Sequence, residues 1–168
     1  MRRSEDIVAI VGLVLGAVFG MAGTMVESQH LRAAFWALDS TGLVVATALL
    51  AMKFFRQGKD LVAAGFLVFA IGESVMLSGT ALSVAESAPA FAAGTALWSA
   101  ALLLISVPRE FAAWIRVAGV VAAGLFAFTS SEIFCGHPLT PMSSPMPYFA
   151  YPFLVLNFIG WIWTLRKA

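Results

Sequence analysis

Runs of about twenty apolar residues recur along the whole chain, and they limit its possible folds more than any other feature. The chain has 168 residues, of which 61% are hydrophobic and 11% are charged. A soluble domain is usually about 45–50% apolar and about 25% charged. A run of roughly 20 apolar residues is long enough to cross a hydrocarbon layer of about 30 Å. The sequence therefore predicts one integral membrane domain over residues 1–168.

Short polar stretches divide the chain into six such segments. Backbone polar groups must be hydrogen-bonded inside a membrane, and the segments are too continuously apolar for the alternating strands of a barrel. We therefore expect an all-α bundle of six transmembrane helices. The expected helices cover residues 7–26, 34–55, 61–83, 90–107, 112–134 and 148–165.

The first segment follows two arginines, a start that also occurs in cleaved signal peptides. Glu5 and Asp6 interrupt this basic start, and the apolar run continues as far as Val26. A run of that length can span the bilayer. We therefore expect the segment to stay in the protein as its first helix.

The basic residues predict an orientation. If both termini are cytoplasmic, nine of the ten Lys and Arg residues fall on the inner side and only Arg32 falls outside. Cytoplasmic loops of multi-pass proteins carry such an excess of Lys and Arg. We expect a multi-pass protein of a bacterial inner membrane with both termini cytoplasmic. The net charge of +1 gives no reason to expect a nucleic-acid partner.

Two expected helices carry glycines at regular spacing. Small residues spaced in this way make a smooth helix face that lets a neighbouring backbone approach closely. We favour packing within the bundle over a dimer seam, because six short helices must first pack on each other. The glycines concerned are Gly12, Gly16 and Gly20 in the first helix and Gly65, Gly72 and Gly79 in the third.

Glu73 lies inside the apolar stretch AIGESVMLSG at residues 70–79. It follows Asp60 by 13 residues, which is roughly 20 Å along a helix, so it is expected near the midplane or in the outer half of the membrane. An ionised carboxylate there costs several kcal/mol and is usually protonated, paired or hydrated. Such a residue is a candidate for binding a proton or a cation. The alternative is a protonated side chain that hydrogen-bonds a neighbouring helix.

Asp39 lies about one and a half turns below the outer end of the second expected helix. Gly42 and Ala46 follow on the same face, so this face is expected to point into the bundle. Asp39 and Glu73 are predicted at similar depths and could share a water-filled pocket. The alternative is that Asp39 hydrates or caps its own helix end.

Four more polar residues are candidates inside or near the ends of the expected helices. Glu132 follows Ser130 and Ser131 near the outer end of the fifth helix, where the hydroxyls are suitable ligands for water or ions. Asn157 is the main polar group of the sixth helix and could hydrogen-bond another helix. With Glu73 these groups suggest an outward-open polar vestibule.

The remaining polar candidates are in the expected outer loops. Glu27 and His30 fall in the first outer loop, and His137 falls in the last. Metal sites need clusters of His, Cys and carboxylate, and this chain has only two histidines and one cysteine, Cys135. We therefore expect no metal site and no cofactor. The proline-rich last loop is expected to be a rigid connector, with a lid over the bundle as the alternative.

Three functions fit these features. The first is a proton- or cation-linked transporter or channel for a small solute, with Glu73 as its central group. The chain is short for a monomeric transporter, so a homo-oligomer is expected beside the lipid bilayer as a partner. The second is a non-catalytic subunit of a larger membrane complex. The third is a small intramembrane enzyme or lipid-binding protein that uses Asp39 and Glu73, although no common hydrolase, nucleotide or dinucleotide motif occurs in the sequence.

Overall fold

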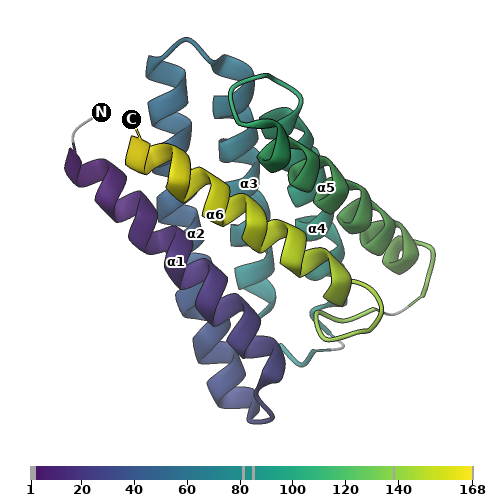
Figure 1. The fold of residues 1–168 in the computed structure, drawn as a ribbon. Coiled ribbons are helices and arrows are strands. Elements are labelled where there is room, and N and C mark those ends of the chain that lie inside the picture. Colours follow the sequence, from purple (N-terminus) through teal and green to yellow (C-terminus); the bar gives the residue numbers. More distant parts are fainter. Residues whose placement is uncertain (1–2, 81, 85, 138, 168) are drawn as a thin grey trace.

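The computed structural model describes residues 3–80, 82–84, 86–137 and 139–167. Within these ranges the chain folds into six α-helices and one short 3₁₀ helix, with no strand, so the expected all-α class is confirmed. Each α-helix is long and apolar enough to cross a membrane. The helices are α1 (Arg3–Met25), α2 (Gln29–Arg56), α3 (Asp60–Gly79), α4 (Ala88–Ser106), α5 (Ala113–Phe134) and α6 (Tyr151–Lys167), with η1 (Tyr148–Ala150) before the last (Figure 1).

The first two helices begin four and five residues earlier than the sequence predicted. α1 starts at Arg3 and not at residue 7, and Glu5 and Asp6 lie in its first turn, where acidic side chains interact favourably with the helix dipole. α2 starts at Gln29 and not at residue 34, because the side chain of Ser28 caps it by accepting from the amide of Leu31. The charged residues near these ends are therefore part of the helices.

The third expected helix was too long. α3 ends at Gly79 and not at residue 83, and the hydroxyl of Thr80 donates to the carbonyl oxygen of Leu77 in its last turn at 2.8 Å. The sixth helix also begins later than expected, at Tyr151, since the preceding three residues form the 3₁₀ helix η1. The shorter α3 leaves a longer α3–α4 connection, which forms part of the cavity described below.

The six helices form a closed ring. Each packs on its neighbour in sequence, and α6 lies across the front of the bundle and closes the ring by contacting both α5 and α1 (Figure 1). The chain reverses direction at every connection, so both termini lie at one end, called here the termini end (Figure 1). The other end, with the α1–α2, α3–α4 and α5–α6 connections, is called the distal end.

Glycines on α1 set its close contact with α2. A methyl group at Gly12 would collide with the carbonyl oxygen of Gly42, and one at Gly16 would collide with the side chain of Leu43. A methyl group at Gly20 would lie 3.0 Å from the nearest atom of α2. The glycine face of α1 therefore packs inside the bundle, as predicted.

The glycines of α3 likewise set the close contact of α3 with α4. A methyl group at Gly65 would lie 3.0 Å from the carbonyl oxygen of Ala101, and one at Gly72 would lie 3.1 Å from that of Gly94. Gly79 faces the first turn of α4 in the same way. Both glycine stripes are thus used for packing between helices of one chain.

Aromatic side chains fill the centre of the ring. Phe66 and Trp161 meet edge to face with ring centroids 4.9 Å apart, and Phe69 stacks on Trp98 at 5.2 Å. These rings join α3 to α4 and α6, although the α3 and α6 backbones are not close neighbours. The buried aromatic cluster consists of Phe66, Phe69, Trp98, Phe126, Phe158 and Trp161.

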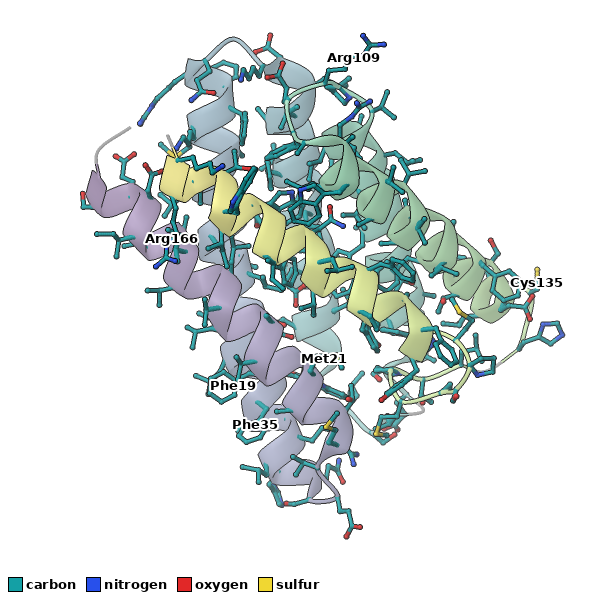
Figure 2. The ribbon with its side chains drawn as sticks, viewed as in Figure 1. Phe19, Met21, Phe35, Arg109, Cys135 and Arg166 are labelled. Atoms are coloured by element: carbon teal, nitrogen blue, oxygen red, sulfur yellow. The ribbon has the colours of Figure 1, made fainter. Side chains whose placement is uncertain are left out.

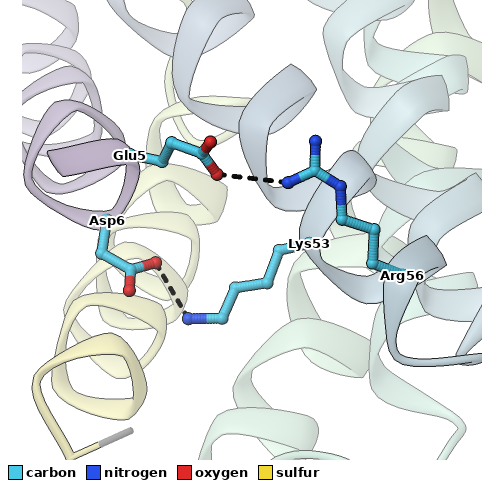
Figure 3. Close-up of polar contacts among 4 residues, drawn as sticks. All are labelled: Glu5, Asp6, Lys53 and Arg56. Carbon is cyan, nitrogen blue, oxygen red and sulfur yellow. Dashed lines mark hydrogen bonds and ion pairs between the residues drawn. The ribbon is translucent and has the colours of Figure 1, made fainter. Parts of the chain in front are cut away.

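Ion pairs tie the helices together at the termini end. Lys53 on α2 is buried and its Nζ lies 2.9 Å from a carboxylate oxygen of Asp6 on α1, while Arg56 lies 3.4 Å from Glu5 (Figure 3). The Lys53 pair is shielded from water, so the loss of Asp6 would leave an uncompensated buried charge.

The basic residues are distributed unevenly between the two ends. Arg109 and Arg166 lie toward the termini end, and Cys135 marks the distal end (Figure 2). Among the basic residues that the structure describes, only Arg32 lies at the distal end, where its guanidinium donates to the carbonyl oxygen of Val26 at 2.6 Å. Arg2, which the orientation prediction also counted, is outside the described residues.

The Gly12 contact gives a direct test of this packing. Gly12→Ala is expected to lower the free energy of unfolding by about 1–3 kcal/mol, because the added methyl group must displace the Gly42 backbone. The matched control is Gly124→Ala on α5, where the added methyl group meets nothing within 4 Å and should stabilise the helix by about 0.5–1 kcal/mol. Thermal unfolding in detergent measures both, and equal stability of the two variants would contradict the packing.

Candidate functional site

A cavity of about 110 Å³ opens among α1, α2, α3, α4 and α6 in the distal half of the bundle. One water molecule needs roughly 10–15 Å³ of such space, so the cavity has room for several waters or a small organic molecule. Its walls are mostly apolar and aromatic. Its polar lining includes two carboxylates, Asp39 and Glu73. The structure thus brings together the two acids for which the sequence suggested a shared pocket.

Glu73 is 2% exposed and reaches the cavity from α3. Its Oε1 accepts a hydrogen bond of 2.6 Å from the hydroxyl of Ser40 on α2. Its Oε2 is buried and has no hydrogen-bond partner among the described residues. The Nε1 of Trp98 is nearby but outside hydrogen-bonding geometry. Glu73 therefore has an oxygen free to accept a bond from water or a ligand.

Asp39 is 9% exposed and lines the same cavity from α2. Its carboxylate packs against the backbone of α1 at Gly20, where a side chain would come within 3.0 Å of Oδ2. Its Oδ1 is buried, and within the described part of the chain it has no hydrogen-bond partner. The Asp39 and Glu73 carboxyls are close enough to interact electrostatically. Asp39 faces the bundle interior and does not cap its own helix.

Aromatic side chains form much of the remaining wall. Trp36, Trp98 and Phe158 line the cavity, and Tyr151 joins them at the start of α6. The Tyr151 hydroxyl donates to the carbonyl oxygen of Pro141 at 2.9 Å, which fixes the last loop against the cavity. Pro141 itself lines the cavity, so this loop contributes to its wall and is more than a connector.

The α3–α4 connection forms the rim of the cavity. Thr80, Val84 and Ser87 all line it. Ser83 and Glu86 bond to each other reciprocally. The Ser83 hydroxyl and amide donate to a Glu86 oxygen at 2.6 and 3.1 Å, and the Glu86 amide donates to the Ser83 hydroxyl oxygen at 3.3 Å. These bonds lower the pKa of Glu86 from its ordinary value, so this exposed carboxyl stays ionised at the rim at neutral pH.

The aromatic cluster closes the cavity toward the termini end. Trp98 and Phe158 line the cavity. Both rings pack on Phe69, and Phe158 also packs on Trp161. Beyond them lies a second hollow of about 140 Å³ at the termini end, lined in part by Phe66 and Trp161. The cluster is therefore the barrier between hollows at opposite ends of one bundle.

The second hollow is bordered by charged side chains of both signs. Lys53 and Lys59 line it together with Glu110, and Lys59 Nζ lies 2.6 Å from a Glu110 oxygen. Lys53 is paired with Asp6, as described above. Both lysines are thus neutralised by acids, in contrast to the carboxylates of the first cavity.

Three predicted site residues on α5 do not reach the cavity. Glu132 is partly exposed and its Oε2 lies 2.8 Å from Nδ1 of His137, which is also exposed. The hydroxyls of Ser130 and Ser131 both donate to the carbonyl oxygen of Ala127 in their own helix. The proposed vestibule does not include these residues, because α5 lies on the far side of α4 and α6 from the cavity.

Asn157 is fully buried but lies outside the cavity lining. Its Nδ2 donates to the carbonyl oxygen of Phe153 in the same helix at 2.9 Å. Its Oδ1 and the hydroxyl of Ser106 both lie beside Gly119, but neither atom has a hydrogen-bond partner among the described residues. The hydrogen bond to another helix that the sequence suggested for Asn157 is therefore not present in the described part of the chain.

The outer-face candidates are at the distal end but do not line the cavity. Glu27 and His30 are exposed at the α1–α2 connection, and His30 lies in the first turn of α2 and not in a loop as expected. Within the described ranges, no group of three or more His, Cys, Asp and Glu residues is arranged to hold a metal ion.

Sequence reasoning missed several cavity residues. Ser40 directly follows Asp39 in the sequence, and its hydroxyl is the hydrogen-bond partner of Glu73 on the neighbouring helix α3. Trp36 and Trp98 also line the cavity, and neither was among the candidates from the sequence. Tyr151 gave no signal, because its position depends on how the last loop folds back.

No protein-family model, curated protein or solved structure matches this chain. The chemistry of the cavity is therefore the basis for assigning a function.

The hydrogen bond from Ser40 to Glu73 can be tested by mutation. Ser40→Ala leaves both Glu73 oxygens without a protein partner, so the free energy of unfolding should fall by about 1–3 kcal/mol. Ser131→Ala is the control, because its exposed hydroxyl bonds only its own helix, and a change within about 0.5 kcal/mol is expected. Chemical unfolding in mixed micelles measures both, and an equally small effect at Ser40 would contradict the contact.

Proposed function

We propose that this chain is a multi-pass protein of a bacterial inner membrane, with both termini cytoplasmic. The charge asymmetry between the two ends of the bundle supports this orientation. Membrane insertion is supported by the large apolar side chains exposed on the outside of the helices, which would be unfavourable in water. Among these exposed residues are Val18, Leu67, Ile71, Val117 and Phe128. In this orientation the cavity faces the outside.

We further propose that the protein moves protons or small cations across that membrane, with Glu73 as the central group. The observation that carries this proposal is the pair of carboxyls in a largely apolar cavity, each with one buried oxygen that has no partner among the described residues. Ionisable residues at membrane depth commonly mark proton and ion pathways. Asp39, Glu73 and Tyr151 are the titratable groups of the described lining.

The arrangement of the two hollows supports a transport mechanism. A site near the midplane that is open to one side and closed toward the other matches one state of alternating access. In this mechanism the aromatic cluster is the barrier that must open toward the cytoplasm. Phe69, Trp98 and Trp161 would have to separate or shift for Glu73 to reach the second hollow. A homo-oligomer remains part of this proposal, because the chain is short for a transporter acting alone.

The orientation has a simple test, because Cys135 is the single cysteine and is exposed. A membrane-impermeant maleimide should label Cys135 on intact cells if the distal end is outside. The control carries Cys135→Ser together with Gln57→Cys, which moves the thiol to an exposed site at the termini end. This variant should be labelled only after the cells are opened. The reverse labelling pattern would contradict the orientation.

The transport role predicts that Glu73→Gln abolishes flux in a folded protein. Purified protein is reconstituted into vesicles with an entrapped pH indicator, a membrane potential is applied, and sodium, potassium or methylammonium is supplied outside. The wild type should change the internal pH with at least one of these ions, and Glu73→Gln should reduce the rate tenfold or more. Glu132→Gln is the matched control, since this acid pairs with His137 away from the cavity.

Elution of Glu73→Gln as a single species at the wild-type position shows that the variant folds. Equal flux in the wild type and Glu73→Gln would remove Glu73 from the mechanism. No flux above empty vesicles with any of the three ions would contradict transport and leave the role of a complex subunit.

A further inference from the structure

We propose that the ligand of the distal cavity is a small organic cation, a protonated amine with a short hydrocarbon body. This inference deepens the transport proposal and rests on it for its biological meaning. The first argument is the charge of the lining. Asp39 and Glu73 both contribute carboxyls, and no Lys, Arg or His is among the described lining residues. A bound cation would supply the positive charge that these buried acids lack.

The unpartnered atoms supply the second argument. Oδ1 of Asp39 and Oε2 of Glu73 are buried acceptors without a hydrogen-bond donor among the residues described. An ammonium group has several N–H donors and no acceptor, so it complements two carboxyls better than a hydroxyl does. Hydrogen bonds of an ammonium to a carboxylate are about twice as strong as neutral ones.

The rest of the lining favours a ligand with an organic body. The cavity wall includes Leu43, Met76, Phe91, Leu154 and Phe158. These side chains offer contacts to hydrocarbon and none to a hydration shell. Aromatic faces also attract alkylammonium groups, and indole does so most strongly. Two indoles, Trp36 and Trp98, line the same cavity.

A bare inorganic cation fits this lining less well. Calcium takes six to eight oxygen ligands and magnesium requires an octahedron of them. The carboxyls of Asp39 and Glu73 and the hydroxyl of Ser40 are the oxygens held together at the centre of the site, and Ser40 already donates to Glu73. Three such groups leave the coordination sphere of a metal ion incomplete.

The entrance has the same polarity as the cavity. Glu86 is exposed on the loop that forms the rim, and Glu27 is exposed at the same end of the bundle. The opposing charge at this end is Arg32, whose guanidinium is held by the carbonyl oxygens of Val26 and Glu27. A negative rim raises the local concentration of cations and speeds their entry.

The experiment uses tert-butylammonium chloride and its neutral isostere tert-butanol as probes. Binding to the full-length protein in detergent micelles is measured by isothermal titration calorimetry at constant ionic strength, held with sodium chloride. The amine should bind the wild type saturably and at least tenfold more tightly than the alcohol. Glu73→Gln and Asp39→Asn should each weaken amine binding tenfold or more. Glu132→Gln should bind as the wild type does.

Each other outcome contradicts the proposal in a specific way. Equal binding of the amine and the alcohol would show an apolar pocket that does not recognise charge. Amine binding that falls in proportion to sodium, when sodium chloride replaces lithium chloride at the same ionic strength, would show an inorganic cation site. Wild-type amine affinity in both Glu73→Gln and Asp39→Asn would place the amine elsewhere.

The binding and flux experiments fail independently. If Glu73→Gln loses flux while the wild type binds no amine, transport stands and the ligand class is wrong. If the amine binds through Glu73 while no vesicle shows flux, the site stands and the transport role is wrong.

Discussion

The burial of Glu73 next to Asp39 is the constraint on which the rest of this structure depends. Two carboxyls in an apolar bundle are costly unless they are protonated, hydrogen-bonded or paired with a cation. The protein supplies one hydrogen bond, from Ser40, and leaves one buried oxygen on each acid without a partner in the described residues. Apolar side chains of similar size would pack such a bundle without this cost. The two acids are therefore the basis of the proposal that a ligand or proton binds here.

The helix packing explains why the acids meet. The glycine stripe of α1 brings α2 close, and Gly20 leaves the space in which the Asp39 carboxyl lies. The stripe of α3 brings α4 close and places Trp98 beside Glu73. Aromatic rings fill the centre of the ring of helices, so the space that remains is divided between the distal cavity and the hollow at the termini end. The cavity and its barrier are thus two consequences of one packing arrangement.

The sequence was sufficient to predict the six helices and that Asp39 and Glu73 could line one pocket, because apolar runs and a charge within them are local signals. It did not separate Glu132, Ser130 and Ser131 from these two acids, although they lie on α5, which contributes no residue to the described lining of the cavity. In a helix that is apolar on all sides, periodicity does not reveal which face is inward. The predicted helix boundaries were wrong where capping by Ser28 sets the start of α2 and where a turn ends α3 after Gly79. Tyr151 and Pro141 depend on a loop fold that no local pattern encodes.

Native mass spectrometry of the wild type beside Glu73→Gln tests the central claim most directly. It measures whether a ligand stays bound to the buried acids when the protein is extracted from the membrane. The account predicts that gently solubilised wild-type protein carries a small adduct with the mass of an organic amine, and that Glu73→Gln carries none. Unliganded protein in both samples, or the same adduct on both, would contradict the claim that these carboxyls form a binding site.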